Sequence, residues 1–171
     1  MKGVRQVLLV VILGVGIFFL MQTTLQSSVV VGRSMEPSFQ EGQRLIVSKV
    51  AYKFGEPEIG DVIIFHPPTS DQLDYIKRVI ALPGDTVEIK TGTVYVNGSP
   101  LDEPYINDPP RYAYPQQQIP TDYYFVLGDN RNNSNDSHTG WLLPRENIIG
   151  EAWLSIWPPS EWGVVPDYSS Q

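Results

Sequence analysis

The sequence predicts a mainly β fold, an antiparallel-sheet domain behind a single N-terminal transmembrane helix. Apolar runs, either alternating or continuous, recur from residue 44 onward, each bounded by Gly, Pro or Asp, and few windows show helical spacing. Fifteen prolines and fourteen glycines in 171 residues favour turns and short strands over a helix bundle. One uninterrupted apolar run, Val7–Met21, lies near the N-terminus.

Residues 6–25 are expected to cross a bilayer. They extend the apolar run, without a charge, to 20 residues, roughly the number that a hydrocarbon core requires. Lys2 and Arg5 precede this segment, and the next basic residue is Arg33. The positive-inside bias therefore predicts that residues 1–5 stay on the cytoplasmic or stromal side.

Residues 26–171 are then expected to form an exported domain on the trans side, in a periplasm, outside the cell or in a thylakoid lumen. A cleaved signal peptide has the same basic start and apolar centre. Cleavage needs small residues at the third and first positions before the cut, and Gln22–Ser28 offers only poor matches. The sequence favours an uncleaved anchor.

The charge balance argues against nucleic acid as a partner. The chain carries a formal charge of −7, and the residues beyond Arg5 contain 10 basic and 19 acidic side chains. Nucleic-acid binding requires a basic surface. The chain has no cysteine, which excludes disulfides, thiol catalysis and cysteine-ligated metal sites.

Seven strands are expected in the exported domain. Thr91-Gly92 is expected to turn a hairpin, and Pro104–Pro120 to form an extended surface loop, so that residues 86–122 make an inserted hairpin and loop subdomain. Gly-Asp occurs at residues 60, 84 and 128, where glycine is expected to supply a positive φ. The expected strands are Arg44–Ser48, Asp61–His66, Tyr75–Ala81, Thr86–Lys90, Thr93–Asn97, Tyr123–Leu127 and Ile148–Ile156.

Ser34 is the first candidate for chemistry because it follows Leu25, the end of the apolar segment, by only nine residues. Nine residues span at most about 30 Å, so its hydroxyl must work close to a bilayer surface. A serine nucleophile needs a base. His66, His138 and a lysine are the candidates.

Lys77 lies in an apolar strand pattern. Alternation places it on the face opposite Arg78, which allows one of the two cations to be buried while the other is solvated. Burial lowers a lysine pKa, and a neutral Lys77 can accept the Ser34 proton. Two alternatives remain open: a lysine whose stem packs while its ammonium stays in water, and a hydrolase that pairs Ser34 with His138, although the Gly-x-Ser-x-Gly elbow is absent.

A polar segment, Gly128–His138, directly follows the expected strand Tyr123–Leu127. It concentrates hydrogen-bonding side chains at a strand end, where supporting residues of active sites often lie. A solvated surface loop is the alternative.

These segments resemble, in order and spacing, the sequence boxes of type I signal peptidases, closest in style to cyanobacterial and thylakoid members. The boxes are Ser34–Phe39, Tyr75–Val79 followed by Pro83-Gly84-Asp85, and Gly128–His138. The resemblance covers about residues 29–159. It implies an antiparallel Ser-Lys peptidase fold in a membrane-bound serine endopeptidase that removes signal peptides from exported pre-proteins after Ala-X-Ala-type sites.

The resemblance also assigns roles to residues. Ser34 is the nucleophile and Lys77 the general base, Ser134 orients the lysine, and Asp136 is a structural acid. The shallow substrate pockets are implied to be lined by Met35, Phe39, Tyr75 and Ile76. The family needs no cofactor and no metal. Its partners are pre-proteins and the lipid bilayer, with no required protein partner evident.

Three positions depart from the family pattern. His138 replaces the usual arginine partner of Asp136, which makes that pair sensitive to pH near neutrality. Gly32 replaces a Ser or Thr hydroxyl that many members place in the oxyanion hole, so the hole is expected to rest on the Ser34 backbone N–H, with a contribution from Gly32 unsettled. Phe39 replaces the usual leucine. A non-catalytic anchored β domain that binds export substrates is the remaining alternative.

Overall fold

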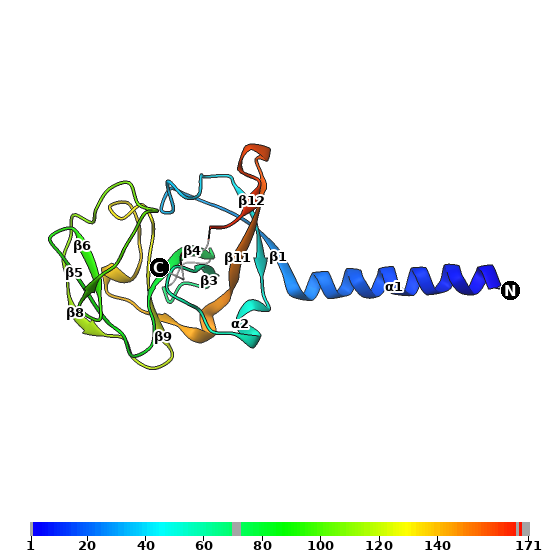
Figure 1. The fold of residues 1–171 in the computed structure, drawn as a ribbon, viewed down its shortest axis with the longest axis horizontal. Helices are drawn as coiled ribbons and strands as arrows, with labels where there is room; N and C mark the ends of the chain where they lie inside the picture. Colours follow the sequence, from blue (N-terminus) through cyan, green and yellow to red (C-terminus); the bar gives the residue numbers. More distant parts are fainter. Residues whose placement is uncertain (1, 70–72, 167, 169–171) are drawn as a thin grey trace.

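A single long helix projects from a β-rich body in the computed structural model, which describes residues 2–69, 73–166 and 168 (Figure 1). The helix is α1, Lys2–Thr24. Within that part of the chain, only α1 is long and apolar enough to cross a membrane, judged by length and composition. The candidate span is Gly3–Thr24; an 18-residue window within it has a mean hydropathy of 2.4, and none of that window is buried against the rest of the protein.

The main sheet has eight antiparallel strands in the order β1-β2-β11-β3-β4-β9-β10, with β12 paired to β11. Strand β1 begins at the residue after α1 ends, so the helix enters the sheet without a linker. The strands are β1 (Leu25–Val29), β2 (Arg44–Ser48), β3 (Val62–Phe65), β4 (Tyr75–Ala81), β9 (Tyr123–Leu127), β10 (Leu143–Pro144), β11 (Ile148–Trp157) and β12 (Gly163–Val164).

A second, four-stranded sheet lies on the side of the body away from α1, at the left of Figure 1. Its order is β7-β6-β5-β8, from β5 (Thr86–Lys90), β6 (Thr93–Val96), β7 (Ser99–Pro100) and β8 (Tyr114–Gln118). The β5–β6 hairpin turns at Thr91 and Gly92, with φ of 49° and 79°, as a type I′ turn requires.

Four short helical segments connect the strands. Figure 1 places α2 at the end of the body from which α1 projects. The segments are α2 (Ala51–Phe54) and the 3-10 turns η1 (Ser137–Thr139), η2 (Arg145–Asn147) and η3 (Pro159–Glu161).

The expected strands form at or within one residue of their predicted ends, but the expected loop Pro104–Pro120 is partly wrong. Residues 114–118 form β8, which pairs with β5. The sequence hides this strand because its side chains are mostly exposed glutamines, with Tyr114 the buried exception. Backbone pairing with a neighbouring strand needs no apolar alternation. Strand β1 was also not anticipated.

Both faces of β4 are buried, so neither Lys77 nor Arg78 is the solvated cation that alternation allows. Arg78 is 1% exposed, and its guanidinium donates to both carboxylate oxygens of Asp129 at 2.7 and 2.9 Å and to Gly60 O at 2.7 Å. The ring of Tyr105 lies 4.0 Å from its Cζ. A buried arginine is tolerated because its charge is paired and its donors are satisfied.

Candidate active site

The side chains of Ser34 and Lys77 meet although 43 residues separate them. Lys77 lies in the middle of β4, and its Nζ is 2.7 Å from Ser34 Oγ and donates to Ile76 O at 3.0 Å. Lys77 is 4% exposed. Burial lowers the pKa of Lys77 to about 8, against a smaller opposing effect of the Asp136 and Asp129 carboxylates. The alternative in which the Lys77 ammonium stays in water is therefore wrong.

The polar segment Gly128–His138 holds the Ser34 backbone in place. The Ser34 carbonyl accepts from Asn130 N–H at 3.0 Å, and Asn130 Nδ2 donates to Arg33 O at 3.0 Å. On the other side, Met35 is fully buried in the core and anchors the same turn. Ser34 is thus fixed between a core residue and a hydrogen-bonded loop.

Asp136 organises the loop from within. Its carboxylate is fully buried, accepts from Gly128 N–H at 2.9 Å and lies 2.6 Å from His138 Nδ1. The His138 ring stacks on Tyr112, with centroids 3.9 Å apart. His138 therefore faces Asp136 and Tyr112, while Ser34 Oγ has Lys77 as its partner. This arrangement does not favour the Ser-His alternative.

Gly128 is required by close approach. A methyl group on its Cα would collide with the Ser34 carbonyl oxygen and with Ser134 Oγ. The expectation of a positive φ holds for Gly60 and Gly84, at 102° and 90°, but not for Gly128. Ser134 Oγ is buried beside this glycine without a hydrogen-bond partner among the described residues.

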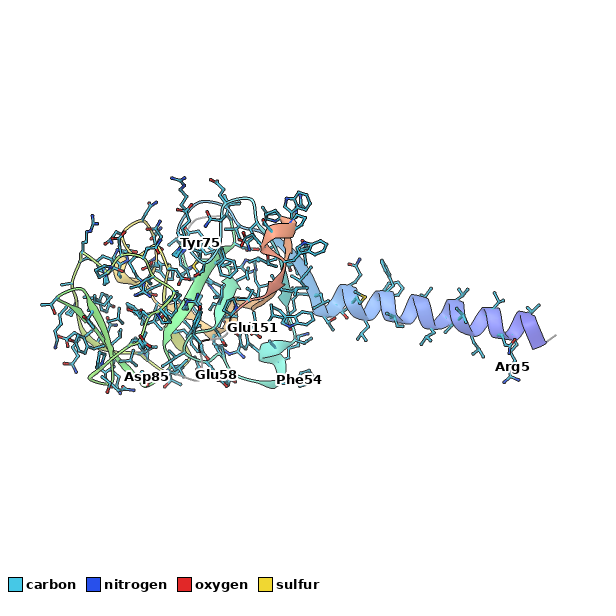
Figure 2. All side chains as sticks on the ribbon, turned by 45° about the horizontal axis from the view of Figure 1, so that its top comes forward. Arg5, Phe54, Glu58, Tyr75, Asp85 and Glu151 are labelled. Atoms are coloured by element: carbon cyan, nitrogen blue, oxygen red, sulfur yellow. The ribbon has the colours of Figure 1, made fainter. Side chains whose placement is uncertain are left out.

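An open groove of about 220 Å³ runs along Ser34 and Lys77. Of the four expected pocket residues, Tyr75 and Ile76 line it. Met35 and Phe39 are buried in the core cluster that also contains the groove-lining side chains of Ile76, Leu45 and Ile64. Tyr75 lies on β4 (Figure 2), and its ring centroid is 5.2 Å from Lys77 Nζ. The other lining residues are Ser28, Val29, Val30, Val31, Gly32, Arg33, Asp74, Asn133 and Asn135.

The oxyanion hole was expected to use the backbone N–H of Ser34, with Gly32 as a second residue to consider. The Ser34 N–H has no hydrogen-bond partner within the described part of the chain. Gly32 lines the groove with φ of 81°, and its N–H donates to Glu41 Oε1 at 3.3 Å. A side chain at position 32 would be strained at this φ.

Sequence reasoning missed the buried charges behind the loop. Arg131 lies 2.5 Å from Glu103, and its Nε donates to Gly128 O at 3.0 Å. Arg131 thus holds Gly128, the residue that follows β9, and Arg78 holds the next residue, Asp129. The partners lie 28 and 51 residues apart in sequence, so only the fold reveals them. The described residues contain no group of three or more His, Asp or Glu that could hold a metal ion.

A serine hydroxyl held against a buried amine, in an open groove of an antiparallel β fold, is an arrangement that suits a hydrolase with a serine nucleophile. The particular family follows from comparison with known proteins: the model for signal peptidase, peptidase S26, matches residues 4–157. The chain belongs to this family.

Named relatives agree with the family. A probable signal peptidase I-1 of Synechocystis is 49% identical over 143 residues, which are 80% of this chain and 73% of the relative. Signal peptidase I of Leptolyngbya laminosa is 41% identical over 98% of this chain and 86% of its own. A crystal structure of a signal peptidase I from Enterococcus faecalis is 30% identical with a TM-score of 0.51, over 57% of this chain and 97% of that chain. Family and fold support signal-peptide removal by a serine peptidase.

Proposed function

We propose that this chain is a membrane-anchored signal peptidase in which Ser34 is the nucleophile and Lys77 the general base. The observation that carries the proposal is the 2.7 Å contact between Lys77 Nζ and Ser34 Oγ at a buried amine. A lysine with a pKa of about 8 is neutral in about a tenth of molecules at pH 7, and far more above pH 8. An unperturbed lysine would hardly deprotonate there.

In the acylation step, neutral Lys77 takes the Ser34 proton while Oγ attacks the scissile carbonyl carbon. The Ser34 N–H, which has no partner among the described residues, donates to the oxygen of the tetrahedral intermediate. The Lys77 ammonium then gives its proton to the departing amine, and the peptide bond breaks. Water, deprotonated by Lys77, hydrolyses the ester and regenerates the Ser34 hydroxyl.

Ser134 and Asp136 are proposed to support this cycle without touching the substrate. Ser134 Oγ is buried with no hydrogen-bond partner among the described residues, so it is free to accept from Lys77 when the lysine turns during the reaction. Asp136 fixes Gly128 and His138, and its charge favours the Lys77 ammonium that forms in the transition state.

The groove favours small side chains on the substrate. Its wall near the dyad is formed by the branched side chains of Leu45, Ile64 and Ile76, backed by the close-packed core that contains Met35 and Phe39. A small apolar pocket in a close-packed wall discriminates by excluding bulk. This supports cleavage after Ala-X-Ala-type sequences.

The segment α1 is proposed to be the membrane anchor, with its N-terminus on the cytoplasmic or stromal side and residues 26–171 on the trans side. Its apolar side chains are exposed, and its 22-residue span is about as long as a hydrocarbon core is thick. Signal-peptide cleavage sites emerge at the same surface.

The test is cleavage of a pre-protein, in detergent and in lipid, by the wild type and three variants. Ser34→Ala and Lys77→Ala are expected to be inactive, a fall of at least about 10⁴-fold, because one lacks the nucleophile and the other the base. His138→Ala is expected to be weakened only. Full activity of Lys77→Ala would refute the dyad, and loss confined to Ser34→Ala and His138→Ala would favour a Ser-His mechanism.

A further inference from the structure

A groove with three cationic side chains lies beside the end of α1 that enters the sheet. We call it the basic groove. It is lined by Thr23 from α1, Lys49, Tyr52 and Lys53 from the β2–α2 region, Arg145 from η2, and Ile148 and Ile149 from β11. It is separate from the groove that contains Ser34 and Lys77.

This concentration of cations runs against the charge of the rest of the domain. The chain has a net charge of −7, and only ten basic residues follow Arg5. Three of these, Lys77, Arg78 and Arg131, are buried. Of the remaining seven, three line the basic groove. A local excess of positive charge on an acidic protein selects an anion.

The cations are only partly neutralised within the described chain. Lys53 has no ion-pair partner among the described residues and belongs to the exposed part of α2. Lys49 Nζ donates to a backbone carbonyl, Gln22 O, at 3.4 Å. Arg145 donates to Tyr52 O and, at 3.0 Å, to Glu56, whose side chain is 75% exposed. Glu56 thus pairs with Arg145 from a largely exposed position.

Other acidic groups near the groove act on Tyr52. Asp61 accepts from the Tyr52 hydroxyl at 2.7 Å, and Glu151 also raises the pKa of that phenol, after burial and Asp61. Neither carboxylate belongs to the lining of the basic groove.

Beside the groove, Lys49 Nζ contacts the Gln22 carbonyl oxygen. That carbonyl belongs to the last turn of α1, and the lysine offsets the negative end of the helix dipole. The 22 residues of Gly3–Thr24 rise about 33 Å, close to the thickness of a hydrocarbon core, so the helix end reaches the headgroup layer. Phe54, at the end of α2, is 92% exposed at this end of the domain (Figure 2).

We propose that the basic groove binds the phosphate of an anionic phospholipid in the leaflet that faces the catalytic domain. Lys49 and Lys53 supply the charge, Arg145 and Thr23 flank the phosphate, and Phe54 enters the interface beside it. The bound headgroup fixes the rotation of the domain about α1, and hence the direction in which the Ser34 groove opens. The inference depends on the proposal that α1 is a membrane anchor.

The test measures binding of short-chain phosphatidylglycerol and phosphatidylcholine to the full chain in detergent, by native mass spectrometry. The variant Lys49→Gln/Lys53→Gln is compared with Lys90→Gln/Arg111→Gln, which removes two exposed cations outside the groove and gives the same net charge. At about 1 kcal/mol for each cation, the groove variant is expected to bind phosphatidylglycerol about 30-fold more weakly. The control variant is expected to bind like the wild type.

Preference for phosphatidylglycerol over phosphatidylcholine, lost only in the groove variant and not displaced by millimolar inorganic phosphate, supports the lipid site. Equal effects of the two variants, equal binding of both lipids, or displacement by inorganic phosphate would overturn it. Cleavage of a short soluble peptide is measured on the same samples. Retained cleavage without lipid preference refutes the lipid site alone, whereas loss of cleavage in Ser34→Ala tests the peptidase proposal separately.

Discussion

Lys77 Nζ lies 2.7 Å from Ser34 Oγ, on a strand whose two faces are both covered by protein. The contact puts an amine that would ordinarily be charged in an environment that disfavours its charge. Desolvation is the largest influence on the lysine, and two nearby carboxylates only partly oppose it. The following predictions test the consequences for rate, stability and loop packing.

The rate of peptide cleavage is expected to rise with pH through an apparent pKa near 8. Only neutral Lys77 can accept the serine proton, and the pKa of Lys77 is lowered to about 8. Below that value kcat/KM should fall about tenfold per pH unit. The measurement is kcat/KM for a peptide substrate from pH 5.5 to 9.5. Lys90→Met, at an exposed lysine, should leave the profile unchanged, and a profile already level below pH 7 contradicts the assignment.

Lys77→Met is expected to abolish cleavage and to stabilise the fold at pH 7 by about 1–3 kcal/mol. The folded state lowers the pKa of this lysine from 10.5 to about 8, so burial of its charge costs stability below pH 8. As pH rises from 8 to 10.5 the unfolded chain holds more protons than the folded one, and the wild type regains stability.

Urea unfolding of the full chain in detergent at pH 7 and pH 10.5 measures this effect. The advantage of Lys77→Met should be largest at pH 7 and shrink at pH 10.5. Lys90→Met is the matched control and should change the free energy of unfolding by less than about 0.5 kcal/mol. A Lys77→Met variant less stable than the wild type at pH 7 would show that the buried ammonium is fully compensated.

Gly128→Ala is expected to reduce cleavage by at least about 100-fold, because the added methyl group must push the Ser34 carbonyl or Ser134 aside. Gly163→Ala is the matched control, since nothing lies within 4 Å of a methyl group there. Peptide cleavage and circular dichroism of both variants separate misplacement of the site from unfolding. Wild-type activity in Gly128→Ala would mean that the junction tolerates displacement.

Asp129→Ala is expected to destabilise the protein by about 3–5 kcal/mol, because it leaves the Arg78 guanidinium buried without its counter-ion. The double variant Arg78→Met/Asp129→Leu removes both charges and should recover much of that loss. Chemical denaturation gives both values. A loss below about 1 kcal/mol in the single variant would show that Gly60 O and the aromatic ring of Tyr105 suffice for Arg78.

Turn chemistry and apolar runs, either alternating or continuous, predicted most strands of this fold. Alternation did not predict the burial of Arg78, since it assigns opposite faces but does not say that one face is open to water. Asp129, which neutralises Arg78, lies 51 residues away. Strand β8 was missed for a related reason. Its own side chains are mostly polar, and it forms because its backbone pairs with β5.

For the site, Ser34 and Lys77 could be paired from sequence because their segments resemble, in order and spacing, the boxes of a known family. The direction of His138 could not, because it depends on the stacking of Tyr112, which comes from a distant loop. The burial of Met35 and Phe39 in the core, away from the surface of the groove, also follows only from packing of the sheet.

Strand β1 follows α1 directly, so a paired strand, and not a flexible linker, leads from the helix toward the turn that carries Ser34. All five residues of β1 pair with β2, so the chain between the helix and the Ser34 turn is held by a sheet and cannot swing like a tether. The pairing of β1 therefore fixes the distance between the end of α1 and Ser34. In the membrane-anchored enzyme proposed above, a substrate bond must reach the Ser34 hydroxyl at this height above the bilayer.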